Sequence, residues 1–203
     1  RFSAPQLLSE GGVLALELLA NPTTGERILD VVKLSARAVS AEAMRTGAAR
    51  VLEGQQAVRR ASAHAASRHV RLALEPINRY QTDFVTNADE GLALIEKVAH
   101  PALGLLLDTC HMNIEESSWA GAFQRAMSAG RLWHVHVADS NRLAPGRGLI
   151  DFGAVVAALR QAGYSGYLSA EIFAQPDPDT AARAALTHML PLLGGAEGDR
   201  PLP

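Results

Sequence analysis

Four short apolar stretches of the chain end in, or contain, a polar residue that could bind a metal ion: Glu75 after residues 70–74, Asp108 after 103–107, His136 within 132–137 and Glu171 after 167–170. Successive members of this set are 33, 28 and 35 residues apart, and each interval has the length of one strand plus one helix. Carboxylate oxygens and an imidazole nitrogen suit Mn²⁺, Mg²⁺ or Co²⁺, and the set lacks the thiolates that structural zinc favours. The residue types and their spacing therefore predict one divalent-metal site.

Helical segments separate these four stretches and would bring their polar ends together. One is expected after an N-cap at Thr86 or Asn87, one over residues 118–129 before Gly130, one from Asp151 to Gly163, and one over 179–193 after the last stretch. Alternating strands and helices predict a parallel sheet of βα units. In a closed parallel barrel, the carboxyl ends of the strands share one face. Four polar residues at those ends would then converge.

Each residue of the set also has an ordinary structural interpretation. A carboxylate that ends a strand often caps the next helix, and this reading applies to Asp108. His134 would point to the same side of its strand as His136, so the spacing alone does not say which of them is a ligand. Cys110 is interpreted as a small buried apolar residue and not as a nucleophile. The metal reading depends on the whole set and not on any single member.

Residues 1–69 are rich in Ala, Leu and Arg and match the βα pattern poorly. The apolar run near Gly12 to Ala20 fits a strand or a helix equally well. Apolar residues between Ile28 and Ala66 recur at loosely helical spacing, which predicts two helices broken near Gly47 and Gly54. We expect one domain over residues 1–203, with clear βα units at 70–193 and a tail at 194–203.

Composition narrows the class of protein. Of the 203 residues, 48% are hydrophobic and 20% are charged, as in globular proteins. The net charge of −2 and the absence of any basic cluster beyond Arg59 and Arg60 argue against binding to nucleic acid or an anionic membrane. No apolar run approaches the roughly 20 residues that span a bilayer. The single cysteine, Cys110, favours a reducing compartment, and we expect a cytoplasmic location.

The motifs around the four polar residues resemble those of a known family. The segments are LALEPINRYQTDF at 72–84, LLLDTCHMNIEE at 105–116, HVHVADSNRLAPGRG at 134–148 and YLSAEI at 167–172. In order and spacing they resemble the xylose isomerase-like barrels of the sugar-phosphate isomerase and epimerase superfamily, and among these the ketose 3-epimerases of the tagatose and psicose type. The implied fold is an α/β TIM barrel, here incomplete, with four secure C-terminal βα units and a mostly helical N-terminal region.

This resemblance also implies roles for individual residues. Glu75, Asp108, His136 and Glu171 would hold a divalent metal ion, with Mn²⁺ favoured over Mg²⁺ or Co²⁺. Glu75 and Glu171 would also be the acid and base that move a proton next to a ketone, through an enediolate intermediate. His111, Arg142 and Gln81 would contact the oxygens of a sugar or sugar-phosphate substrate. Association into a homo-oligomer is left open.

The sequence departs from the family pattern at several positions, and these departures leave alternative functions open. Gln81 stands where these epimerases usually have a glutamate, and Leu149 stands where many have a histidine. The family barrel has eight strands, so we expect two or three front units to be missing or altered within residues 1–70. The alternatives are a catalytically silent or truncated metal- or sugar-binding relative, or another superfamily activity such as hydroxypyruvate isomerase or inosose dehydratase.

Overall fold

Five parallel strands in sequence order form the main sheet of the chain. The computed structural model describes residues 19–20, 27–28, 32–33 and 47–194. The strands of the sheet are β3 (Val32–Lys33), β4 (Leu72–Leu74), β5 (Leu103–Asp108), β6 (Leu132–Val137) and β7 (Leu168–Ala170). Two further strands, β1 (Leu19–Ala20) and β2 (Arg27–Ile28), pair antiparallel with each other. The order of the main sheet confirms the predicted βα units, because each strand lies beside the one that precedes it in the chain.

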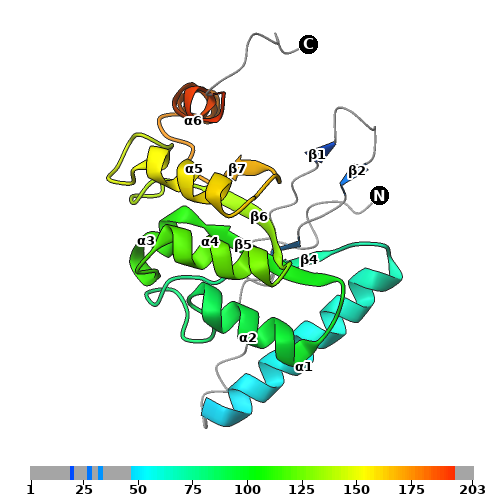
Figure 1. Cartoon of the computed structure of the whole chain (residues 1–203). Coiled ribbons are helices and arrows are strands. Elements are labelled where there is room, and N and C mark those ends of the chain that lie inside the picture. Colours follow the sequence, from blue (N-terminus) through cyan, green and yellow to red (C-terminus); the bar gives the residue numbers. More distant parts are fainter. Residues whose placement is uncertain (1–18, 21–26, 29–31, 34–46, 195–203) are drawn as a thin grey trace.

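Helices connect the strands and cover the outer face of the sheet. They are α1 (Gly47–Ser67), α2 (Ala88–Val98), α3 (Thr109–Glu115), α4 (Trp119–Ser128), α5 (Phe152–Gln161) and α6 (Pro178–Leu193). Figure 1 shows α2, α4 and α5 side by side on one side of the strands, with α1 beyond α2 and α6 beyond α5. No helix in the described part of the chain combines the length and the apolar character needed to cross a bilayer.

The predicted ends of the helices are confirmed by their caps. Asn87, and not Thr86, caps α2 by accepting a hydrogen bond from the Glu90 amide. Ser118 and Asp151 cap α4 and α5 in the same way. Gly130 and Gly163, just beyond the ends of α4 and α5, have φ of 64° and 77°, a region that favours glycine.

Successive side chains of a strand point to opposite faces of the sheet, so the core residues and the candidate site residues lie on different faces. The odd-numbered residues Leu103, Leu105 and Leu107 of β5 belong to the buried cluster formed with the apolar faces of α2, α4 and α5. Asp108 therefore points to the other face of the sheet, with the even-numbered residues. His136 pairs in register with Asp108 and points the same way.

The structure corrects the prediction for the N-terminal region. Among the described residues, Arg27–Ile28 and Val32–Lys33 are strands where the first predicted helix was expected to start, whereas the helix predicted nearer Ala66 is present as α1. The described helix starts at Gly47 and runs unbroken through Gly54. Helix α1 keeps a glycine there because a Cβ at Gly54 would overlap the Phe84 ring. Leu19–Ala20 is a strand, while the rest of the 12–20 run and the tail at 195–203 lie outside the described residues.

A bulge between β5 and β6 places Trp133 against Gly104. Leu105 pairs with Leu132 while Leu106 pairs with His134, so Trp133 is the extra residue. Its ring covers the Gly104 backbone, and the Arg71 guanidinium lies 4.8 Å from its centroid. The indole therefore lies close to the strand, where no side chain would fit beneath it.

We expect Gly104→Ala to lower the free energy of unfolding by about 1–3 kcal/mol, because the new methyl group would overlap the indole. Urea unfolding measures the change. Gly121→Ala in α4 is the matched control, because there a Cβ meets only the far end of the long Arg125 side chain at 3.0 Å and makes ordinary contacts with Ser118. Equal stability of the two variants would contradict the close packing of Trp133.

Candidate metal centre

The structure brings the four predicted ligands together at the carboxyl ends of β4 to β7. Glu75, Asp108, His136 and Glu171 each offer one ligand atom, and these atoms all lie within 4.8 Å of one another. The first three side chains are buried, and Glu171 is 23% exposed. His136 Nδ1 lies 2.8 Å from Glu171 Oε2, 3.8 Å from Asp108 Oδ2 and 4.0 Å from Glu75 Oε1. The imidazole nitrogen therefore faces all three carboxylates.

Asp108 has both of the roles considered from the sequence. Its Oδ1 caps α3 by accepting hydrogen bonds from the Cys110 and His111 amides at 2.9 and 3.2 Å. The same oxygen accepts a hydrogen bond from Arg142 Nη1 at 2.7 Å. Asp108 Oδ2 is buried, faces His136 and has no hydrogen-bond partner. The cap holds one oxygen in place, and the other is directed into the cluster.

Arg142 offsets part of the negative charge of the cluster, and the carboxylates favour a proton on His136. Arg142 bridges Asp108 and Glu171, with Nη2 2.6 Å from Glu171 Oε2. Burial lowers the pKa of His136, but its hydrogen bond to Glu171 and the fields of the three carboxylates outweigh this and leave the pKa raised. The site therefore attracts positive charge.

The donor set fits a divalent cation. Three carboxylates and one imidazole provide hard oxygen and nitrogen ligands. A buried carboxylate oxygen without a hydrogen bond, such as Asp108 Oδ2, is costly unless a cation or donor satisfies it. These observations identify Glu75, Asp108, His136 and Glu171 as the residues that could hold the ion.

The three residues expected to contact substrate differ in their placement. His111 lies in the site, with Nε2 3.8 Å from Glu75 Oε1. Arg142 has a φ of 64° and lies against the cluster carboxylates, where it is 17% exposed. Gln81 is exposed in the turn after β4, where its backbone N–H donates to the Asn78 backbone carbonyl at 2.9 Å. Among the described contacts of the cluster, none involves the Gln81 side chain.

Asp139 is a buried residue that the sequence reasoning missed. Its carboxylate accepts hydrogen bonds from the amides of Ser140, Gly146 and Ile150 at 2.8, 2.9 and 3.1 Å. Burial raises its pKa, and these amides outweigh the effect and leave the pKa lowered. A Cβ at Gly148 would overlap the same carboxylate. An aspartate followed by a Gly-x-Gly at 146–148 was the sequence signal for this arrangement.

The Asp139 loop, residues 139–150, fixes the position of Arg142. The Arg142 amide donates to the Asp139 carbonyl at 2.8 Å. The Arg142 carbonyl in turn accepts from the Phe173 amide at 2.8 Å, which ties the loop to the segment after Glu171. Asp139 thus helps to hold the guanidinium against the cluster.

His134 lies beneath His136 and stays neutral. Its Nε2 is 2.6 Å from Ser169 Oγ, and the two imidazole rings meet edge to face at 5.1 Å. Burial, together with the charge on His136, lowers the pKa of His134 to about 4. His134 is not one of the four residues whose ligand atoms lie within 4.8 Å of one another.

The neutral His134 gives the chain a pH-dependent stability. Unfolded, its pKa returns to about 6.5, so the unfolded state takes up a proton that the folded state does not. Stability is therefore unaffected above about pH 6.5 and is lost as the pH falls toward about 4. Between about pH 6.5 and about pH 4, protonation of His134 in the unfolded state should lower the free energy of unfolding of the wild type by on the order of 3 kcal/mol. We expect His134→Gln to lack this decrease. Urea unfolding of both metal-free proteins at about pH 7 and about pH 4.5 measures it. Parallel pH courses would contradict the expectation.

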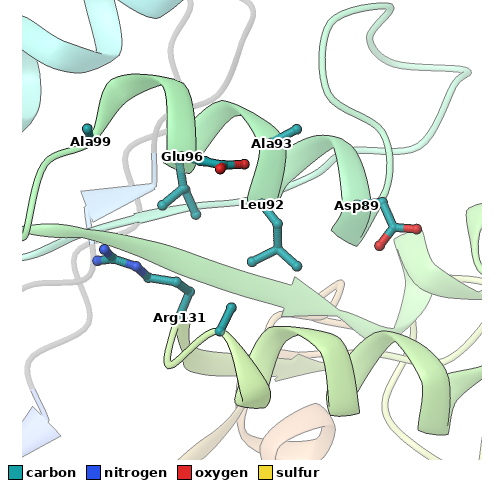
Figure 2. Close-up of a pocket in the computed structure, with 8 residues that line it drawn as sticks. Asp89, Leu92, Ala93, Glu96, Ala99 and Arg131 are labelled. Atoms are coloured by element: carbon teal, nitrogen blue, oxygen red, sulfur yellow. The ribbon is translucent and has the colours of Figure 1, made fainter.

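A groove of about 550 Å³ runs along α2 in the helical layer, away from the cluster. Figure 2 shows Asp89, Leu92, Glu96 and Arg131 around it. Arg131 Nη1 already donates to the Leu103 carbonyl at 3.1 Å, at the start of β5. None of the residues that line the groove belongs to the metal cluster.

Comparison with known proteins identifies the family. Residues 30–192 match the family model of the xylose isomerase-like TIM barrel. The chain belongs to this family. The crystal structure of D-psicose 3-epimerase with D-tagatose from Clostridium cellulolyticum H10 superposes on this TIM-barrel chain with a TM-score of 0.68 at 27% identity, covering 79% of this chain and 61% of that one.

Curated and solved relatives from Methylomonas are also similar to this xylose isomerase-like chain. L-ribulose 3-epimerase of Methylomonas sp. (strain DH-1) is 40% identical over 118 residues, which are 58% of this chain and 40% of that protein. The structure of D-allulose 3-epimerase from Methylomonas sp. gives a TM-score of 0.66 at 31% identity and covers 71% of this chain and 56% of that one. Both relatives are named as 3-epimerases. The chain spans about two fifths of the length of the first.

Proposed function

We propose that this chain carries the metal site of a metal-dependent sugar isomerase or epimerase that interconverts ketoses by proton transfer through an enediolate. One observation carries the proposal: Glu75, Asp108, His136 and Glu171 place their ligand atoms within 4.8 Å of one another at the strand ends. Relatives with the same fold are named as 3-epimerases of ribulose, psicose and allulose.

In this proposal the four clustered side chains hold Mn²⁺, with Mg²⁺ or Co²⁺ as alternatives. When bound, the ion polarises the ketone oxygen and makes the neighbouring carbon more acidic. Arg142 orients Glu171 and Asp108, because its guanidinium contacts both at 2.6 and 2.7 Å. Arg142 and His111 bind oxygens of the sugar once it enters.

Glu75 and Glu171 are the proposed base and acid. They follow β4 and β7, the outer two of the four strands that supply the cluster, so they approach a sugar between them from different sides. One carboxylate oxygen takes the proton from the carbon beside the ketone, and the other glutamate returns a proton to the opposite face. Inversion at that carbon requires two such groups.

Binding and exchange measurements test the proposal. Titration calorimetry with MnCl₂ measures metal binding, and proton NMR of D-tagatose in deuterated water measures exchange at the carbon next to the ketone. We expect both Mn²⁺ binding and metal-dependent exchange. Metal binding without exchange supports the catalytically silent relative instead, a reading that the exposed Gln81 and Leu149 favour. Absence of both overturns the metal site as well.

A further inference from the structure

A buried hydrogen bond links Asn78 to His111. Asn78 Nδ2 lies 2.8 Å from His111 Nδ1, and the two residues are 3% and 4% exposed. Both groups are therefore removed from water, and each must satisfy the other. The direction of this bond decides where His111 carries its proton.

The backbone fixes the orientation of the Asn78 amide. Its Oδ1 accepts a hydrogen bond from the Tyr80 amide at 3.1 Å, two residues along the chain. The Asn78 carbonyl holds the same turn by accepting from the amides of Gln81 and Thr82 at 2.9 and 3.2 Å. Because Oδ1 faces a backbone N–H, the NH₂ group is the part that faces His111.

An NH₂ group can only donate, so His111 Nδ1 must offer its lone pair. The ring proton of the neutral imidazole then lies on Nε2, which faces Glu75 Oε1 at 3.8 Å.

We propose that Asn78 is a positioning residue that holds His111 in the Nε2–H tautomer. This rests on the proposed function, in which His111 binds an oxygen of the sugar. Through Nε2 the ring donates a hydrogen bond to that oxygen and cannot remove a proton from it. Asn78 thereby assigns His111 to orientation and leaves proton transfer to the glutamates.

Nitrogen-15 NMR of the histidine-labelled chain tests the tautomer directly. Two-bond ¹H–¹⁵N correlations at neutral pH, with and without diamagnetic Mg²⁺, separate the two nitrogens of each ring, and His111→Gln assigns the signal among the seven histidines. We expect Nε2–H for His111. His100 is an internal reference, because its Nδ1 accepts from the Ala102 amide at 3.1 Å and it should show the same tautomer.

Asn78→Asp reverses the direction of the bond. The carboxylate still accepts from Tyr80 but now also accepts from His111 Nδ1–H, so the Nδ1 signal should change from lone pair to N–H. We expect kcat/KM to fall about tenfold to a hundredfold, as for other residues that orient a functional histidine. Asn87→Asp is the matched control, because it makes the same charge change while keeping the cap of α2, and it should leave the His111 signals unchanged.

The outcomes separate this inference from the proposed function. A wild-type His111 with its proton on Nδ1, or on both nitrogens, overturns the inference whatever the activity. An Asn78→Asp variant that changes tautomer but keeps full kcat/KM also overturns it. If the chain converts no sugar, the proposed function fails while the wild-type spectrum still decides the tautomer. The same spectrum decides it if the variant does not fold.

Discussion

Glu171→Gln is expected to lower kcat for ketose epimerisation about a thousandfold at saturating Mn²⁺, and Glu75→Gln should have an effect of similar size. Each change keeps the shape of the side chain but removes a carboxylate that takes or returns a proton. Saturating metal is needed because both residues also belong to the cluster within 4.8 Å. Glu53→Gln, exposed on α1, is the matched control and should be unaffected.

Exchange with solvent distinguishes the roles of the two glutamates. With one glutamate replaced, the other can still take the proton from the epimer that it faces. Each variant should therefore exchange the proton of one epimer into deuterated water without converting it, and the two variants should prefer opposite epimers. Full epimerisation by either variant would remove the two-glutamate mechanism.

Asp108→Asn is expected to weaken Mn²⁺ binding by more than a hundredfold and to leave the metal-free chain within about 1 kcal/mol of wild-type stability. The amide oxygen can keep the bonds of Oδ1 to α3 and Arg142. The NH₂ group replaces Oδ2, which has no hydrogen bond and lies in a group of buried carboxylates. The variant loses the attraction between the Asp108 charge and Arg142, but it also loses the repulsion between Asp108 and the other two carboxylates. A metal ion would meet the NH₂ group of the new side chain, which cannot bind it.

Asp108→Ala separates the two roles of this residue. It leaves the amides of Cys110 and His111 without their cap and Arg142 without one partner, so stability should fall by about 2–4 kcal/mol. Calorimetry with MnCl₂ and urea unfolding measure both properties for both variants. A large loss of stability in Asp108→Asn would show that the metal-free fold itself needs the negative charge of Asp108, which would contradict the metal reading of Oδ2.

Local patterns predicted which side chains would lie close together. Unit spacing placed Asp108 and His136 at the carboxyl ends of neighbouring strands, and the structure pairs them in register. Asp108 can both cap α3 and belong to the cluster, because its two oxygens face different partners. Short helix α3 was not predicted, because its seven residues are too few to show a helical period.

Long-range contacts account for what the sequence could not predict. Gly54 suggested a break in a helix, but its neighbour across space is the Phe84 ring, 30 residues away. Apolar spacing over 28–33 suggested a helix, whereas pairing with β4 makes Val32–Lys33 a strand. The bridging position of Arg142 depends on a loop held by Asp139, which no local period reveals.

The Asp139 loop contains both side chains that hold its shape and side chains that point outward. The side chains of Asp139, Ser140 and Asn141 all bond backbone groups within residues 139–150, so the shape of the loop depends on these residues and on the small residue Gly148. Leu149 is 92% exposed, and its amide is already bonded to Ser140 Oγ at 3.0 Å. Different side chains at such outward positions can be exchanged without moving Arg142. This loop is therefore a place where substrate preference could diversify, by natural drift or by library selection, while the charged centre is preserved.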